Sequence, residues 1–193
     1  MKFDLKYGAG IKTVQIPEEV DIKLLQPETM PVLKSLPFAL GDALENPLGC
    51  DALSKQLKQK EQSRIALAIP DATLATPVKK LVSIVLEHIY QSLPDLKPGV
   101  ITIVIGSGLH TPPDIEKQND LIPYDIVHGC NIVVHDANKF MAKDFGTTSR
   151  GTPVRINAAF AEADFKIVIG QIDPHQFVGF TGGSKAAVIG CAS

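Results

Sequence analysis

Residues 165 to 185 read FKIVIGQIDPHQFVGFTGGSK, an apolar run followed directly by a glycine-rich loop. The run from Phe165 to Ile169 is typical of a β-strand, and in open α/β sheets ligands bind beyond the carboxyl ends of such strands. The loop carries one histidine, His175, and one lysine, Lys185. We therefore expect both side chains to take part in chemistry at one edge of a sheet.

Upstream of this stretch, strand-like and helix-like segments alternate. The expected strands are apolar runs bounded by Gly, Pro or Asp, and the expected helices repeat apolar residues every three or four positions. The strands cover 64–69, 100–105 and 131–135, and the helices cover 77–93 (capped by Thr76), a short polar stretch after Asp114, and 156–163. This order predicts an α/β fold with a mostly parallel, Rossmann-like sheet flanked by helices.

The N-terminal part follows a different pattern. Residues 2–7 and 12–16 alternate around Gly8, which predicts a small β hairpin, whereas four prolines between residues 20 and 60 would break any helix there into short pieces. With 193 residues in total, we expect a single domain over 1–193, because this length supports one sizeable core but not two ordinary domains.

Composition narrows the classes of function. The net charge of −2 gives no basic surface for nucleic acid, and no apolar run approaches the ~20 residues of a membrane-spanning helix. The N-terminus lacks the apolar core of a signal peptide, so we expect a cytoplasmic protein. Three widely spaced cysteines fit neither a disulfide framework nor a zinc site.

Polar residues follow three of the predicted strands at equivalent positions. Asp71, His110 and His175 each come shortly after a strand end. If the strands are parallel neighbours, these side chains meet at one edge of the sheet. They could then serve as acid/base groups, or as the ligands of a metal-dependent hydrolase. His88, His128 and His135 receive no functional role.

The loop from Gly179 to Lys185 is not a phosphate-binding P-loop, because serine precedes the lysine and Ala186 follows it. Its adjacent glycines, Gly182 and Gly183, still allow backbone amides to approach an anion. Lys185 could act there as a cation or as a nucleophile.

A set of short motifs, in this order and spacing, resembles the N-terminal domain of the nickel-pincer-dependent lactate racemase family. The resemblance covers residues 64–193 well and extends over most of the chain through weaker features. The motifs are Asp71-Ala72-Thr73, Gly106 to His110, His135-Asp136-Ala137, Gly146 to Val154, Ala163-Asp164, Gly170, Pro174-His175, Gly179-Phe180 and Gly182-Gly183-Ser184-Lys185.

This resemblance implies a racemase or epimerase of 2-hydroxy acids that works by transient hydride transfer. The cofactor would be a nickel-pincer mononucleotide, a pyridinium thioamide/thiocarboxylate linked covalently through Lys185. His110 and His175 would be the two acid/base groups. The cofactor-binding residues would be Lys185, Asp71, Thr73, Gly182 and Gly183, and no residue of this chain is assigned as a metal ligand.

The sequence departs from the family pattern in two places. Leu74 stands where the family has an arginine associated with the substrate carboxylate, so the expected substrate is a 2-hydroxy acid other than lactate, or lactate held by other contacts. Family members are also longer, and the chain stops at Ser193. We expect an N-terminal domain truncated before a C-terminal partner domain, and inactive by itself. The alternatives are a family member that only binds a nucleotide or small anion, and the metal-dependent hydrolase.

Overall fold

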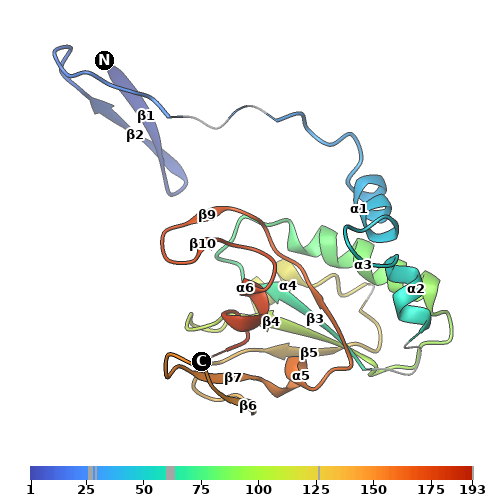
Figure 1. Cartoon of the computed structure of the whole chain (residues 1–193). Coiled ribbons are helices and arrows are strands. Elements are labelled where there is room, and N and C mark those ends of the chain that lie inside the picture. Colours follow the sequence, from blue (N-terminus) through green and yellow to red (C-terminus); the bar gives the residue numbers. More distant parts are fainter. Residues whose placement is uncertain (26–27, 29, 60–63, 126, 193) are drawn as a thin grey trace. The chain divides into compact units, whose positions relative to one another are not determined.

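The computed structural model describes residues 1–25, 28, 30–59, 64–125 and 127–192. The chain forms two compact units, Met1–Lys34 and Ser35–Ser193 (Figure 1). The expectation of one catalytic domain that ends before a second one stays a prediction, and the two units are described separately below. None of the helices in the described part of the chain has the length and apolar character needed to cross a bilayer.

The N-terminal unit contains the predicted β hairpin. Strands β1 (Lys2–Tyr7) and β2 (Gly10–Gln15) pair antiparallel with Tyr7 opposite Gly10. Gly8 has φ +59°, in the left-handed region that glycine adopts at little cost, and this allows the tight turn. The Lys12 ammonium lies 4.6 Å from the centroid of the Tyr7 ring.

The second unit is built on a four-stranded parallel sheet in the order β5-β4-β3-β8. Its strands are β3 (Ile65–Pro70), β4 (Ile101–Gly106), β5 (Asn131–Val134) and β8 (Phe165–Val168). All four match runs predicted from the sequence. The chain moves outward from β3 to β5 and then returns to place β8 on the other side of β3. The strand order thus reverses between β3 and β8, and a crevice is expected at the carboxyl ends of the strands at such a point.

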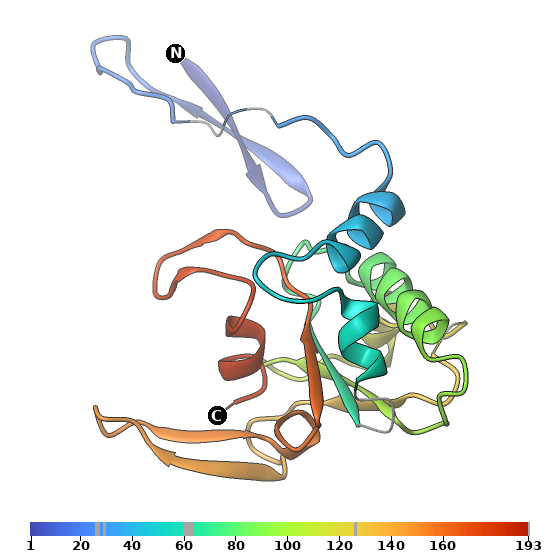
Figure 2. The same ribbon diagram turned by 45° about the vertical axis from the view of Figure 1, so that its right-hand side comes forward.

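The two faces of the sheet have different side chains and different covers. Leucines and isoleucines of the strands form the larger core with α3 (Val78–Ser92), which contacts α1 (Leu36–Glu45), α2 (Leu53–Lys58) and α4 (Ile115–Leu121). Figure 2 shows these helices on one side of the sheet. Smaller residues, alanines and valines, face α5 (Ala158–Ala161) and α6 (Lys185–Val188). Small side chains let α5 and α6 approach closely, and α6 carries Lys185.

Two local predictions need correction. Thr76 does not cap α3, since Pro77 is the N-cap residue and the Thr76 hydroxyl donates to Gln171 Oε1 at 3.2 Å instead. Residues 156–157 are not helical, because they end β7 (Pro153–Asn157), which pairs with β6 (Ala142–Thr147) in an antiparallel ribbon. The expected fragmentation by proline is confirmed between residues 35 and 59, where two short helices form, α1 with Pro37 in its first turn and α2, and Pro47 lies between them.

Candidate active site

A cavity of about 530 Å³ opens at the carboxyl edge of the sheet. The loops after β3, β4 and β8 line it, together with the start of α6. Among the lining residues are Asp71, Thr73, His110, His175, Gly182 and Lys185. The structure thus brings six of the seven predicted site residues to one cavity, and Gly183 lies next to its wall. Their chemical roles remain predictions.

Asp71 holds His110 in a fixed orientation. The aspartate is only 5% exposed, and its Oδ2 lies 2.7 Å from Nδ1 of His110. Its Oδ1 accepts hydrogen bonds from the backbone N–H and the hydroxyl of Thr73. A carboxylate can only accept, so the ring proton of neutral His110 is on Nδ1 and Nε2 is left as an acceptor. This arrangement suits a general base oriented by a buried carboxylate.

His175 is held by hydrogen bonds that favour the opposite tautomer from that of His110. It lies in β9 (Pro174–His175), which pairs with β10 (Gly179–Phe180) in a short antiparallel loop. The backbone N–H groups of Phe177 and Val178 donate to its Nδ1 at 3.2 and 3.4 Å. Neutral His175 therefore carries its proton on Nε2. In the neutral state, His110 offers an acceptor and His175 offers a donor.

The turn before Lys185 depends on glycine. Gly182 has φ +77°, and a Cβ there would lie 2.9 Å from the carbonyl oxygen of Gln171. Gly183 has φ +51° with open space around the Cβ position. Lys185 is half-buried where it lines the cavity, and no carboxylate in the described residues forms an ion pair with its amine. A lysine amine without such a partner is available to a ligand.

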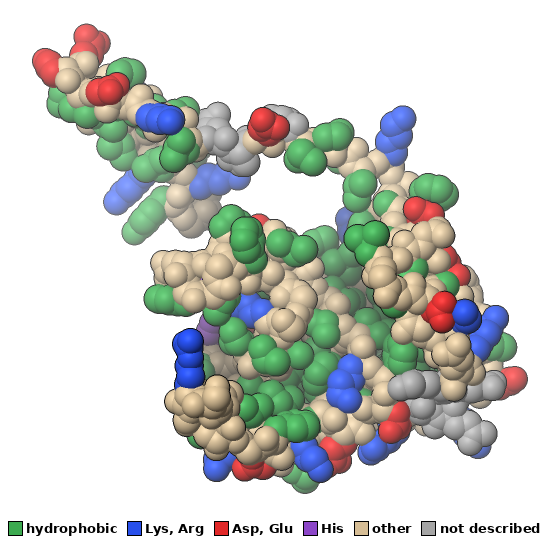
Figure 3. Space-filling model, viewed as in Figure 1, with side chains coloured by type: hydrophobic (Ala, Val, Ile, Leu, Met, Phe, Trp, Pro, Cys, Tyr) green, Lys and Arg blue, Asp and Glu red, His purple; other side chains and the backbone are tan. Residues whose placement is uncertain are grey.

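Apolar side chains make up the outer part of the cavity. Leu74, Leu109, Phe177 and Val178 line it, and Leu109 and Phe177 are 85% and 83% exposed. In the space-filling view, apolar side chains also gather in the hollow between the β9–β10 loop and the β6–β7 ribbon (Figure 3). None of the described residues that line the cavity is an arginine. A carboxylate in this cavity would have to bind other groups.

Sequence reasoning missed Ser107, which lines the same cavity. Its residue is 2% exposed, and its hydroxyl has no hydrogen-bond partner among the described residues. Buried hydroxyls normally have such a partner, so Ser107 is a candidate ligand-binding group. Its position between Gly106 and Gly108, just before His110, was the available signal.

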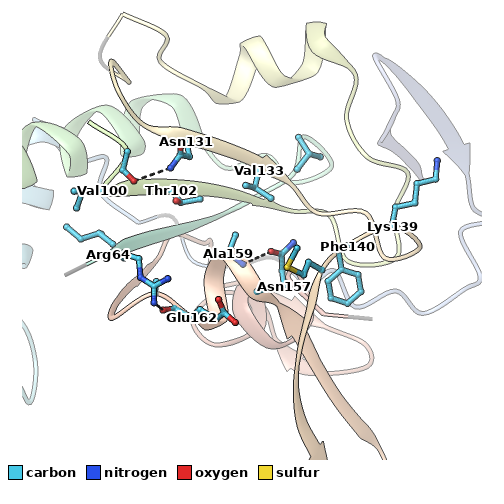
Figure 4. Close-up of a pocket in the computed structure, with 16 residues that line it drawn as sticks. Arg64, Val100, Thr102, Asn131, Val133, Lys139, Phe140, Asn157, Ala159 and Glu162 are labelled. Carbon is cyan, nitrogen blue, oxygen red and sulfur yellow. Dashed lines mark hydrogen bonds between the residues drawn. The ribbon is translucent and has the colours of Figure 1, made fainter. Parts of the chain in front are cut away.

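A second cavity of about 510 Å³ lies on the side of the sheet that α5 covers (Figure 4). Three of its polar side chains are engaged within the protein. The Arg64 guanidinium donates to the backbone oxygen of Glu162, the Asn131 amide donates to Gly99 O, and Asn157 Oδ1 accepts from Ala159 N. This cavity is therefore a weaker candidate than the one at the strand ends.

The described residues contain no group of three or more His, Cys, Asp or Glu side chains that could hold a metal ion. Asp71 and His110 bond to each other, and His175 accepts from backbone amides. The geometry thus does not support the hydrolase alternative, which required these three side chains as ligands.

Comparison with known proteins identifies the family to which the chain belongs. Residues 7–193 match the family described as the lactate racemase N-terminal domain. A lactate racemase from Thermoanaerobacterium thermosaccharolyticum is 31% identical over 152 residues, which are 78% of this chain and 34% of that protein. A lactate racemase from Lactiplantibacillus plantarum is 33% identical over 153 residues, 78% of this chain and 35% of that protein. The chain thus spans about a third of the length of these relatives.

Solved structures agree with this placement. The lactate racemase apoprotein from T. thermosaccharolyticum matches with a TM-score of 0.82 and 26% identity, over 100% of this chain and 44% of that one. A protein from Thermotoga maritima matches with a TM-score of 0.53 and 19% identity over 73% of this chain and 37% of that one, and shares the fold alone. On the sequence match over residues 7–193 and this shared architecture, the chain belongs to the lactate racemase N-terminal domain family.

Proposed function

We propose that this chain is the catalytic and cofactor-bearing domain of a racemase or epimerase of 2-hydroxy acids. The observation that carries the proposal is the meeting of the Asp71–His110 pair, His175 and Lys185 in one cavity of a lactate racemase family fold. Two imidazoles can serve as the acid and the base of an inversion at a hydroxyl-bearing carbon, and the amine can hold a cofactor.

The residues present fit the nickel-pincer nucleotide that the resemblance implies. Lys185 would hold it covalently, and the turn before Lys185 can pack against Gln171 only because Gly182 lacks a Cβ. Gly183 and Thr73 would contact it as well. The Asp71 carboxylate is occupied by His110 and Thr73, so we assign it first to orienting His110. When bound, the cofactor would supply the electrophilic centre that takes up hydride from C2 of the substrate and returns it.

The protein's own residues would handle the proton. His110 Nε2 accepts the hydroxyl proton of the substrate, while His175 donates a hydrogen bond from Nε2–H to the developing carbonyl oxygen. Return of hydride to the opposite face requires the flat 2-keto acid to turn. For His175 to protonate the oxygen in that orientation it must first be an imidazolium, so its Nδ1 has to release the amides of Phe177 and Val178 and take up a proton before Nε2–H is donated. His110 then returns to its neutral form by giving the first proton to solvent.

The side chains of the cavity wall influence which substrate can bind. Leu74 cannot form the bidentate contact that an arginine would make with a carboxylate. Together with Leu109 and Phe177, it makes the outer cavity apolar. We therefore propose a 2-hydroxy acid other than lactate, or lactate held by other contacts. Leu74→Arg should raise activity on lactate relative to longer 2-hydroxy acids, and an unchanged preference would contradict this reading of Leu74.

We also propose that a C-terminal domain completes the site, since the chain covers only about a third of its curated relatives. A cytoplasmic location remains our expectation.

The test uses the full-length protein with Lys185→Ala and a matched control, Lys139→Ala, which removes a lysine from the wall of the second cavity instead. We expect intact-mass spectrometry to find a cofactor adduct, with nickel by elemental analysis, in the parent and the Lys139 variant but not in the Lys185 variant. Racemisation should follow the adduct. An adduct with full turnover in Lys185→Ala would refute the assignment. Nucleotide binding without any adduct in the parent would favour the anion-binding alternative.

A further inference from the structure

The segment that follows α6, Gly190 to Ala192, is pinned to the ends of three strands. Gly108 N donates to Gly190 O at 2.8 Å, and Asn157 N donates to Cys191 O at 2.8 Å. Ala192 forms an antiparallel bridge with Ile156 of β7. Cys191 is fully buried, and burial raises the pKa of its thiol to about 12, so it is an inert part of this contact.

His135, directly after β5, is buried beside this segment and forms hydrogen bonds to Ala192 and Asn157. Its residue is 0% exposed, its Nε2 lies 3.1 Å from Ala192 O, and its Nδ1 lies 3.3 Å from Asn157 Nδ2. The ring packs edge-on against Phe140 with centroids 4.7 Å apart. A carbonyl oxygen can only accept, so Nε2 must carry the proton and Nδ1 must accept.

The orientation of the Asn157 amide independently supports the proton on Nε2 of His135. Asn157 is the N-cap residue of α5, and its Oδ1 accepts from Ala159 N at 3.0 Å. The amide must therefore direct its Nδ2 toward His135, because turning it over would leave the helix uncapped. One hydrogen-bond chain thus runs from the cap of α5 through the neutral ring of His135 to Ala192.

Lys185 is hydrogen-bonded through its backbone to the start of the same segment. Its carbonyl oxygen accepts from the N–H groups of Ile189 and Gly190 at 2.9 and 3.0 Å. The backbone of Gly190 packs closely on Gly106 at the end of β4, since a Cβ at Gly106 would lie only 3.0 Å from the Gly190 carbonyl carbon. Any displacement of Ala192 therefore moves the one turn of helix that carries the cavity lysine.

We propose that His135 is a positioning residue, which fixes Lys185 in the cavity by holding Ala192 through its Nε2–H. The proposal concerns only the placement of the lysine. It does not depend on the chemistry at the lysine amine, so it can fail or hold independently of the racemase assignment.

Two polar substitutions test the two hydrogen bonds of the His135 ring separately. His135→Gln can place an amide N–H near the Nε2 position and keep the bond to Ala192. His135→Asn can keep only an acceptor near the Nδ1 position for Asn157. Amide hydrogen exchange on the chain should be faster at Ile189 and Gly190 in the Asn variant, by up to ~10-fold, since one lost hydrogen bond contributes about 0.5–1.5 kcal/mol and 1.4 kcal/mol corresponds to a factor of ten. Exchange in β3 and β4 should be unchanged.

Competitive acylation of lysines adds a second readout. Lys185 should react faster relative to Lys139 in His135→Asn, and at the parent ratio in His135→Gln. Equal exchange at Ile189 and Gly190 in parent and Asn variant, or equal effects of the two substitutions, would overturn the proposal. If the Asn variant does not fold, ¹⁵N NMR of the unmodified chain decides, since a proton on Nδ1 of His135 would also overturn it.

Discussion

Gly182→Ala tests the loop that presents Lys185, and Gly183→Ala is its matched control. Both glycines have positive φ, +77° and +51°, in one turn. They differ in their surroundings, because a Cβ at 182 meets the Gln171 carbonyl oxygen at 2.9 Å and Ile172 Cγ1 at 3.1 Å, whereas a Cβ at 183 has nothing within 4 Å. The pair separates the cost of the backbone conformation from the cost of the close contact.

The expected magnitudes follow from these two terms. An alanine in the left-handed region costs ~1–2 kcal/mol at either position. At 182, the oxygen it meets belongs to the backbone and cannot rotate away, so overpacking adds ~1–3 kcal/mol. Gly182→Ala should therefore be less stable than Gly183→Ala by at least ~1 kcal/mol, which is about 2–4 °C in Tm for a domain of this size.

The assay is thermal and urea unfolding of the chain, followed by circular dichroism with both variants beside the parent. Gly182→Ala should also speed acylation of Lys185, because the loop has to shift to admit the methyl group. Equal losses of stability in the two variants would refute the reasoning, since the close approach of Gly182 to Gln171 would then have no energetic consequence.

Three further predictions concern the site, the core and pH. Asp71→Asn places an amide N–H against His110 Nδ1, moves the ring proton to Nε2 and should lower racemisation by ~10²–10⁴, while Lys185 keeps its adduct in mass spectra. Leu86→Ala on α3, where the side chain is 0% exposed, should cost ~2–5 kcal/mol in urea unfolding. Burial lowers the pKa of His135 below its ordinary 6.5, so the unfolded chain binds more protons near and below that pH. Stability should fall as pH drops from 7 towards 5, despite the nearby Asp136 carboxylate, and His135→Gln should flatten this slope in pH-dependent melting curves.

Much of the fold could be predicted because its signals are local. The strand from Ile65 to Pro70 is buried along its whole length, and such a strand reads as a continuous apolar run. Helix α3 repeats its apolar residues at the helical period. The β6–β7 ribbon was missed because its strands are mostly exposed and carry no such run. Thr76 was misread as a cap because its partner, Gln171, lies 95 residues further along the chain.

The sequence by itself determined the α/β class and the family. It also determined that Asp71, His110, His175 and Lys185 meet, because parallel strands bring their carboxyl ends to one edge whatever the details of packing. Only the tertiary structure decided how each group is held. The opposite proton positions of His110 and His175 depend on an aspartate 39 residues away in one case and on neighbouring backbone amides in the other. The role proposed for His135 depends on a carbonyl 57 residues away. For His110 and His135 the hydrogen-bond direction is set by contacts between distant segments, and residue types and spacing do not encode those contacts.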